Sequence, residues 1–459
     1  MLWSGIENKT VAHIGANNVI KLADEGHLNL NATDSSKIYE SVGGGAGGAV
    51  GVGASVGGNE IHNTVLASIG TGTIIEGEKA DVSISANSSE TVDSFGVIVA
   101  GGAGALSGGS VYVHIGDKED NASSINYDNQ SDEERKTLDG AQKQKDDMVN
   151  AAKDRNTSAN KSYQDAYNGA LDRIRTQSNG TRLADKEQVS GSLYDLTNRE
   201  VISGTDRKGT AAFIDTAAAL NVKNLNIAAQ NTNDVTLKSA NGTGGAVGIG
   251  VSVAVAEDKT TTNAFVQNST TIAADSVQIS ASSEDKHRLD SYAASGGIFS
   301  GNGSVAVLKS EKTTNAYVNN DAVINAVNGL NIGAQSHSDN NAYAWSDSFG
   351  GVVVGMSIAD AKSIGKTRID LGDNVTLTSE DSDIIINTNA NESTRAEAWA
   401  ATGGVGGGGA ALSTATGGKD STINIGKNFS AETTGKLAIT SRAVNYADTE
   451  SNGRAYGGV

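Results

Sequence analysis

The sequence contains no cysteine and no proline, and only 4% of its 459 residues are aromatic. Without cysteine, the chain has no disulfide, no thiolate ligand for a metal and no cysteine nucleophile. Without proline, every backbone N–H is available to a hydrogen-bond ladder, which favours β-sheet. The scarcity of aromatic residues predicts a core of Val, Ile, Leu and Ala in thin layers rather than one of large rings.

Long apolar runs and clustered positive charge are also missing. No stretch approaches the ~20 consecutive apolar residues of a membrane span. The first nine residues lack the basic region, apolar run and cleavage site of a signal peptide. The net charge of −18 argues against a nucleic-acid groove, which needs clustered Lys and Arg. Because the last residues resemble the start of another Gly-rich strand, we expect the chain to be a piece of a longer protein.

Glycine is abundant, with 57 residues, and it lies in a recurring element. In residues 242–257, branched apolar residues occupy every second position from Val247 to Val255, with Gly, Ser or Ala between them. This alternation predicts a strand with one branched apolar face and one face almost without side chains. Related Gly/Ala strands occur at 45–57, 96–113, 301–308, 350–358 and 403–412.

A second strand pattern follows each Gly/Ala strand and sets a repeat length. The residues at equivalent places, roughly 51 to 54 positions apart, are Val266, Val318, Ile369 and Ile423, with Ile214 one step earlier and the pair Ala12 and Leu66 a similar step apart. About seven degenerate copies of ~53 residues predict an all-β fold, a right-handed parallel β-helix whose coils pair with their neighbours. We expect three coils of about 18 residues in each copy.

Stacked coils also predict ladders of polar side chains at the corners, because like residues of successive coils lie above one another. The candidate corner pairs are Asn319 with Asn320 and Asn340 with Asn341.

The pattern changes character between residues 117 and 208. Ser131 and Glu134 have the spacing of a helical capping box, and apolar residues at helical spacing follow. Two antiparallel helices fit this region, and one long helix fits it as well. We therefore predict β-solenoid repeats in 1–116, a mainly α-helical insertion (an αα-hairpin) at a solenoid corner in 117–208, and the same stack continuing in 209–459.

Two short segments match the residue spacing of enzyme motifs. Residues 365–367, Gly-Lys-Thr, match the end of a phosphate-binding loop, but Asp360 replaces its first glycine and no helical pattern follows. Ser55 lies in a Gly-x-Ser-x-Gly sequence, but the surrounding pattern is that of a strand. We interpret both as products of glycine-rich strands rather than as sites.

Acidic clusters and histidines are candidate metal ligands. Residues 117–120 and 380–383 are rich in carboxylates, but neither cluster matches a calcium-binding loop, and we expect solvated corners. The histidines show no metal-binding spacing; they are His13, His27, His62, His114, His287 and His337. We predict no catalytic, cofactor-binding or metal-binding residue and no cofactor.

The aromatic residues form one further candidate. Tyr343, Trp345 and Trp399 stand beside small and acidic residues, and the two tryptophans are about one repeat apart. Equivalent positions in neighbouring copies favour a structural ladder of rings. A surface that stacks on sugars is the alternative.

The Gly/Ala alternation, together with residues 366–391, KTRIDLGDNVTLTSEDSDIIINTNAN, resembles the repeat regions of large bacterial filamentous adhesins similar to filamentous haemagglutinin. The Gly-rich strand followed by an Asn-Ala-Phe-Val strand is most similar to the leukotoxin-type filamentous adhesins of Gram-negative anaerobes. The likeness covers about four-fifths of the chain. It implies two-partner secretion through an outer-membrane transporter, folding at the cell surface, and adhesion. The amino-terminal secretion domain of such proteins is not recognisable in this sequence.

These patterns predict a structural shaft segment of a secreted, surface-associated filamentous adhesin, without catalysis and without nucleic acid as a partner. Its expected partners are a host-cell or bacterial surface receptor, protein or glycan, and other copies in a self-associating filament. The alternatives are a polysaccharide-acting β-helix enzyme, which needs convergent carboxylates in a groove, and a carbohydrate-binding module.

Overall fold

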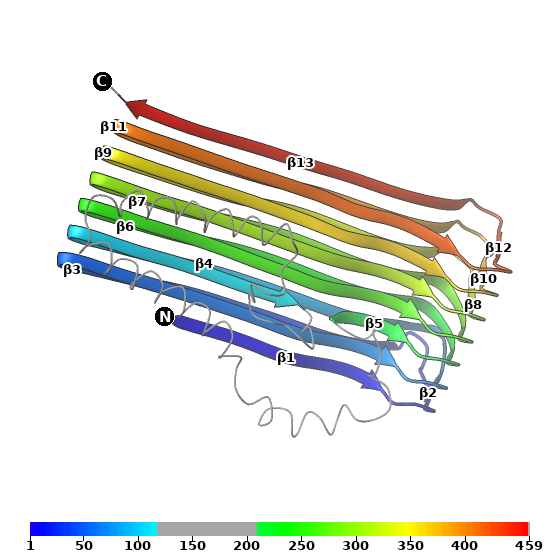
Figure 1. Ribbon diagram of the computed structural model, residues 1–459. Helices are drawn as coiled ribbons and strands as arrows, with labels where there is room; N and C mark the ends of the chain where they lie inside the picture. Colours follow the sequence, from blue (N-terminus) through cyan, green and yellow to red (C-terminus); the bar gives the residue numbers. More distant parts are fainter. Residues whose placement is uncertain (117–208, 458–459) are drawn as a thin grey trace.

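The computed structural model describes residues 1–116 and 209–457, and all regular secondary structure in these residues is β-strand. The strands are β1 Leu2–Ile14, β2 Val19–Lys21, β3 His27–Ile69, β4 Ile74–Gly116, β5 Thr210–Ile214, β6 Ala219–Val266, β7 Thr271–Val318, β8 Val323–Ala326, β9 Leu330–Leu371, β10 Thr376–Ser379, β11 Ile384–Ile425, β12 Ser430–Thr433 and β13 Leu437–Gly457. They form one sheet in which the neighbouring strands pair in parallel (Figure 1). The all-β prediction is confirmed for the described residues. The predicted helical insertion at 117–208 lies outside them.

The long strands reverse direction about halfway along. The hydroxyl oxygens of Ser239 and Ser252, both in β6, are 2.8 Å apart, whereas thirteen residues of straight strand span roughly 43 Å. The reversal falls beside Gly245, where the pairing register with β4 is interrupted. A Cβ atom on Gly297 in the next strand would lie 2.2 Å from the Gly245 carbonyl oxygen, so the stacked corners leave no room for a side chain.

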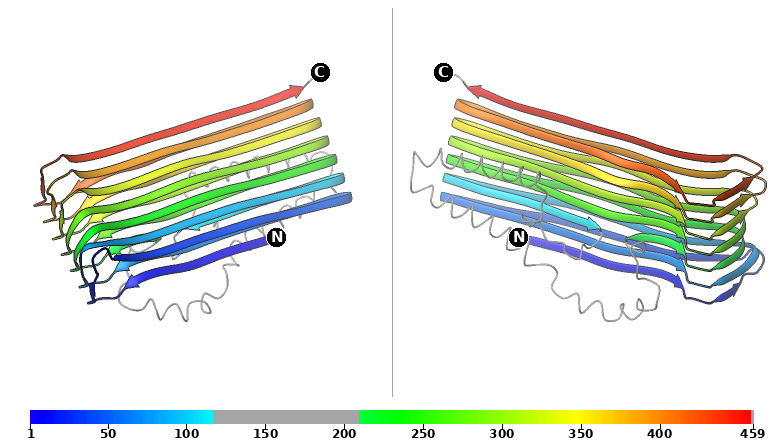
Figure 2. Two further views of the ribbon diagram at one scale, coloured as in Figure 1. Left: turned by 180° about the vertical axis from the view of Figure 1, so that it is seen from behind. Right: turned by 45° about the vertical axis from the view of Figure 1, so that its right-hand side comes forward.

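Each long strand therefore has an outgoing arm, a glycine corner and a return arm that packs against the outgoing arm. At the other end of the coil, here called the wide end, a turn and a short segment such as β8 or β10 join the return arm to the next outgoing arm (Figure 2). One coil is thus a flattened loop with two long sides and one short side. Stacking of these loops is compatible with the predicted parallel β-helix.

One coil corresponds to one repeat. Ala219 of β6 faces Thr271 of β7, 52 residues later, and Leu330 of β9 faces Ile384 of β11, 54 residues later. The prediction of three coils of about 18 residues in each copy is therefore wrong. A single long strand accounts for most of a repeat, since β6 alone has 48 residues.

The two predicted corner pairs have different outcomes. The side-chain amide of Asn319 donates to Gln267 Oε1 at 2.7 Å, and the backbone N–H of Asn320 donates to Asn268 Oδ1 at 3.1 Å, so this pair forms the predicted ladder. Asn340 is instead fully buried within β9, and the prediction that it marks a corner is wrong.

The interior at the wide end is apolar. Ile227, Ile279, Ile332 and Ile386 stand above one another in successive coils, each fully buried. Nearer the glycine corner lies a second apolar cluster, whose members in β9 and β11 are alanines. Its row of Leu237 and Leu289 continues into Ala342 and Ala396. In β9 and β11, side-chain size in the interior thus decreases from the isoleucines at the wide end to the alanines nearer the corner.

In the return arm of β6, the branched face predicted from the sequence points outward. Gly250 and Ser252 are buried, whereas Val251 and Val253 between them are half-exposed. The face almost without side chains lies inside because the two arms approach each other closely there. The described residues contain no helix that could cross a membrane.

Candidate functional site

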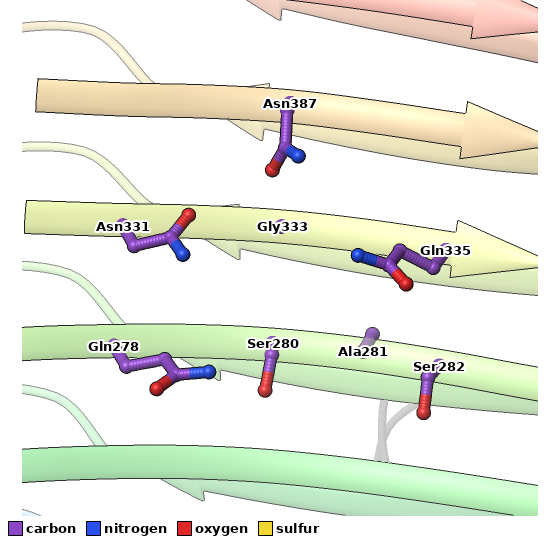
Figure 3. Close-up of a pocket in the computed structure, with 8 residues that line it drawn as sticks. All are labelled: Gln278, Ser280, Ala281, Ser282, Asn331, Gly333, Gln335 and Asn387. Carbon is purple, nitrogen blue, oxygen red and sulfur yellow. The ribbon is translucent and has the colours of Figure 1, made fainter.

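A shallow polar hollow lies on the outer face of the outgoing arms of β7, β9 and β11. Its volume is about 250 Å³, and Gln278, Ser280, Gly333, Gln335 and Asn387 are among the residues that line it (Figure 3). Ser280, Gly333 and Asn387 stand in one row across the three coils. A side chain at Gly333 would meet Asn387 Oδ1 at 3.2 Å, so the glycine keeps the floor of the hollow low.

A second hollow of about 410 Å³ shares the lining residues Ser282 and Gln335 with the first hollow. It extends toward Glu284, His337 and Asn391. Uncharged amides and hydroxyls, which both donate and accept hydrogen bonds, dominate the lining of both hollows. Such a lining suits a ligand rich in hydroxyl groups. Among the described residues that line the two hollows, Glu284 is the one with a carboxylate. Acid–base cleavage of a glycosidic bond requires two carboxylates.

Aromatic side chains form a row on the same outer face, nearer the glycine corner. Tyr292, Trp345 and Trp399 pair in register across β7, β9 and β11, which confirms that the two tryptophans are equivalent. Tyr343 stacks on Trp345 with ring centroids 5.8 Å apart. Tyr292 is 39% exposed, and the other three rings are half-buried.

Polar side chains hold these rings in place. The Tyr292 hydroxyl donates to Asp347 Oδ2 at 3.0 Å, and partial burial together with this carboxylate raises the pKa of Tyr292. The Arg454 guanidinium lies over the Trp399 ring, 5.2 Å from its centroid. Tyr292 remains 39% exposed beside Asp347, and Trp399 remains half-buried beside Arg454.

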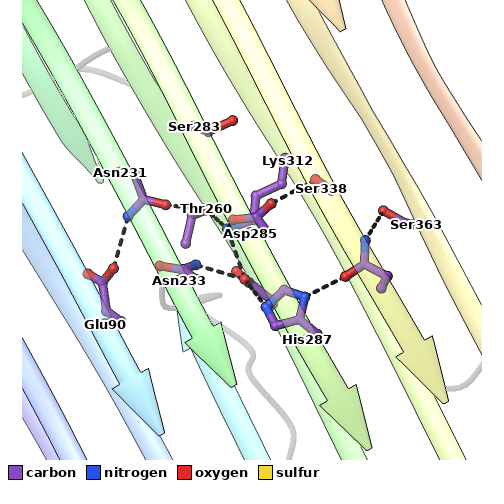
Figure 4. Close-up of polar contacts among 12 residues, drawn as sticks. Glu90, Asn231, Asn233, Thr260, Ser283, Asp285, His287, Lys312, Ser338 and Ser363 are labelled. Carbon is purple, nitrogen blue, oxygen red and sulfur yellow. Dashed lines mark hydrogen bonds and ion pairs between the residues drawn. The ribbon is translucent and has the colours of Figure 1, made fainter. Parts of the chain in front are cut away.

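A buried charge cluster, formed by Asp258, Asp285, His287 and Lys312, lies between the two arms of β6 and β7. Lys312 Nζ is 2.8 Å from Asp258 Oδ2 and 2.8 Å from Asp285 Oδ1, and His287 Nε2 is 2.9 Å from Asp258 Oδ2 (Figure 4). All four side chains are buried. Neutral side chains complete the network: Asn233 donates to Asp258 at 2.7 Å, Ser338 donates to Asp285 at 3.0 Å, and Asn340 Oδ1 lies 2.5 Å from His287 Nδ1.

The charges in this cluster compensate one another. Burial by itself lowers the pKa of Lys312 and of His287, but the neighbouring carboxylates outweigh burial and raise both. Burial by itself raises the pKa of Asp258, but Lys312 and His287 outweigh it and hold that pKa below its usual range. Lys312 thus faces two carboxylates and His287 pairs with one of them, so each buried charged group has a partner.

Glu90 belongs to the same polar layer in an earlier coil. Burial raises its pKa to about 7, although hydrogen bonds from Ser88 and from Asn63, the latter at 3.1 Å, favour the charged form. The amide of Asn231 also donates to Glu90 Oε2, at 3.0 Å. Glu90 is therefore a titrating group inside the stack near neutral pH.

The remaining sequence candidates do not come together. Ser55 is buried within β3, and residues 365–367 continue β9 with no helix after them. Asp383 accepts a hydrogen bond from the Lys436 backbone N–H at 2.8 Å, which ties one wide-end turn to the next coil. The acidic cluster at 117–120 lies outside the described residues.

The histidines are dispersed over several coils. His27 lies 3.3 Å from Asp81, and the rings of His62 and His114 have centroids 5.3 Å apart, while His287 is the member of the charge cluster. Within residues 1–116 and 209–457, no group of three His, Asp or Glu side chains is placed to hold a metal ion.

The equivalence of Trp345 and Trp399 was predicted from the sequence, whereas Tyr292 in the same row, the hollows and the buried charge cluster were not. A comparison with protein-family models, with curated proteins and with solved structures finds no match to the chain. Function is therefore inferred from the geometry of the coils and the chemistry of their surfaces.

Proposed function

We propose that this chain is a shaft segment of a secreted bacterial filamentous adhesin that stands on the cell surface and mediates attachment to host cells or other bacteria. In this proposal the sheet is a right-handed parallel β-helix of about seven repeats. Export runs through an outer-membrane transporter partner, as the resemblance to filamentous haemagglutinin-like adhesins implies. The absence of cysteine suits a chain that crosses an outer membrane before it folds.

The observation that carries the proposal is the continuous register of the coils. The arms of β6, β7, β9 and β11 pair with their neighbours over almost their whole lengths, and each coil contacts mainly the coils beside it. Each additional coil lengthens such a stack by ~4.8 Å without changing its cross-section. This property suits a shaft, in which no coil is unique.

A polysaccharide-acting enzyme is less well supported. Such an enzyme needs a pair of carboxylates, one on each side of the scissile bond. The described residues that line the hollows provide one carboxylate, that of Glu284. Among the described residues, Asp258, Asp285 and Lys312 are buried in the interior and paired. The carboxylates that gather on the outer face, Glu397, Asp448 and Glu450, pair with Arg395.

Immunoelectron microscopy of the cells that produce the protein tests the proposal. Antibodies raised against the purified chain should label fibres that project beyond the outer membrane of intact cells. Cells in which the gene is deleted provide the control and should show no label. Label confined to the cell interior, or confined to secreted material without fibres, contradicts a surface shaft.

A further inference from the structure

Aromatic residues are concentrated on one part of the outer face of the outgoing arms. The chain has three tryptophans, and two of them, Trp345 and Trp399, stand in one row with Tyr292. Neighbouring coils place these side chains roughly 4.8 Å apart along the stack, and Tyr343 widens the row at the central coil. The result is a strip of aromatic surface that crosses three coils.

The surroundings of this strip distinguish it from a purely apolar patch. Asp347 accepts a hydrogen bond from Tyr292, Arg454 covers part of Trp399, and Arg288 lies 5.3 Å from the centroid of the Tyr343 ring. The rings are therefore held before any ligand arrives, which reduces the entropy cost of binding. A sugar has apolar C–H faces and a rim of hydroxyl groups, so flat rings flanked by carboxylates and guanidinium groups match its chemistry.

The polar hollows supply a second contact region on the same face. Gly333 in the first hollow and Trp345 in the strip belong to the same outgoing arm, twelve residues apart, which corresponds to ~40 Å along the strand. Short ligands reach one region or the other. A polymer that reaches both regions gains affinity because its second contact is intramolecular.

Charge favours a neutral polymer over an acidic one. The first hollow is lined by uncharged side chains, and the second includes Glu284. At the strip, Arg288 pairs with Asp290 at 3.0 Å and Arg395 with Glu397 at 3.2 Å, so these positive charges are compensated. The chain as a whole carries a net charge of −18. An anionic polysaccharide is repelled by this net charge, whereas a neutral polysaccharide is not. The shared chemistry of the strip and the hollows is therefore that of a neutral polysaccharide.

We propose that the outer face of the outgoing arms of β7, β9 and β11 binds a neutral polysaccharide, with sugar rings stacked on Tyr292, Trp345 and Trp399 and a distant part of the polymer in the hollow around Gly333. The inference deepens the proposed adhesive function, because it names the class of receptor that this segment contacts.

Isothermal titration of the full chain tests this inference. The probes are two neutral polysaccharides, laminarin and hydroxyethylcellulose, the hexasaccharide of each backbone, and heparin as an anionic comparison. Trp345→Ala and Trp399→Ala should each raise the Kd for polymer and hexasaccharide about tenfold, because stacking residues at the centre of a contact dominate its affinity. Tyr39→Ala is the matched control, since Tyr39 is a 71% exposed ring on the outgoing arm of β3, away from the strip.

Substitutions in the hollow separate the two regions. The double variant Gln335→Ala, Asn387→Ala should weaken binding of the polymer severalfold and leave the hexasaccharide unchanged. Circular dichroism of each variant confirms that the fold is retained, since all of these side chains point outward. No binding to either neutral polymer, an equal loss from Tyr39→Ala, or stronger binding to heparin overturns the inference. Surface fibres seen by immunoelectron microscopy would still support the shaft, so the two proposals fail independently.

Discussion

The wide end and the glycine corner of each coil fill their interiors with different side chains, although both belong to the same parallel sheet. At the wide end, Ile279 and Ile332 are fully buried in an apolar cluster. Toward the corner, Gly250 and Ser252 occupy the interior of β6, and Ser252 bonds to Ser239 on the opposite arm at 2.8 Å. Large side chains keep facing strands about 10 Å apart, whereas small ones let the arms approach more closely.

This difference shows that the cross-section of the coil selects the side chains. Three sides enclose the wide end and leave space for branched residues. Two sides enclose the corner, so the branched residues of β6 between Val247 and Val255 point outward. The buried charge cluster lies between these two regions, where Lys312 reaches two carboxylates. In earlier coils the row of Asp258 is occupied by the buried residues Ile61 and Ile115, so charged side chains replace apolar ones at this level of the stack.

The largest expected effect comes from removing the cation at this transition. Lys312→Met leaves Asp258 and Asp285 buried without their main counter-ion, and we expect a loss of about 3–5 kcal/mol in the free energy of unfolding. Urea denaturation measures this loss. Lys21→Met, which breaks an exposed ion pair with Glu76, is the control and should cost less than about 1 kcal/mol. Equal costs for the two variants would show that the cluster does not support the narrow part of the coil.

The second effect is a dependence on pH centred on Glu90. Burial raises its pKa in the folded state to about 7, against an ordinary value of 4.5, so the folded state binds a proton that the unfolded state has released. Its contribution to stability is complete below about pH 4.5 and is lost as the pH rises through 7, an effect of ~3 kcal/mol. As the pH rises through this range, the urea midpoint of Glu90→Gln should increase relative to that of the wild type. A constant difference between the two proteins contradicts burial of a titrating carboxyl.

The third effect tests directly whether the narrow interior can expand. Ala344 is fully buried in the alanine-rich cluster of β9, and Ala344→Leu should destabilise the protein by about 1–3 kcal/mol because the arms must separate. Ile332→Leu at the wide end conserves volume and should cost less than about 1.5 kcal/mol. Thermal unfolding of both variants provides the comparison. A neutral Ala344→Leu would mean that arm spacing does not limit side-chain size.

Much of the stacking could be predicted from the sequence, because the repeat length and the alternation of faces are both visible there. Ile214 pairs with Val266, and Val266 with Val318, as their alignment predicted. Val318, however, pairs with Leu371 rather than with Ile369. A shift of two residues keeps every side chain on the same face, so periodicity alone cannot detect it.

The register of the first coils also differs from the prediction. Leu66 pairs with Val11, one residue before the predicted Ala12. Unlike a shift of two residues, a shift of one residue moves every side chain to the other face, so the alternation of faces could have excluded it. The prediction of three coils in each repeat was wrong for a different reason. The Asn, Ser and Thr groups that resemble turns are, in residues such as Asn340, inward-facing members of a long arm.

The candidate site was partly predictable as well. Trp345 and Trp399 could be aligned because tryptophan is rare in the chain. The buried charge cluster was missed because its members come from two arms, and their contact depends on where the chain reverses. One signal was present: Asp285 and His287 have the same odd-numbered parity as Ile279 and Leu289, which places them on the inward face.

The smallest effect concerns the turns at the wide end, which differ from the glycine corner in using side-chain-bearing residues with a left-handed backbone. Ala217 has a φ of 56°, whereas Asn374 and Asn428 hold the left-handed positions of later turns with φ of 58° and 54°. Asparagine tolerates this conformation better than alanine does, so Ala217→Asn should stabilise the protein by ~0.5–1 kcal/mol. The reciprocal change, Asn374→Ala, should destabilise it by a similar amount. Both shifts are measurable as changes in Tm. If Ala217→Asn lowers the Tm, packing around the turn outweighs backbone conformation, and the two ends of the coil are limited by the same steric constraint.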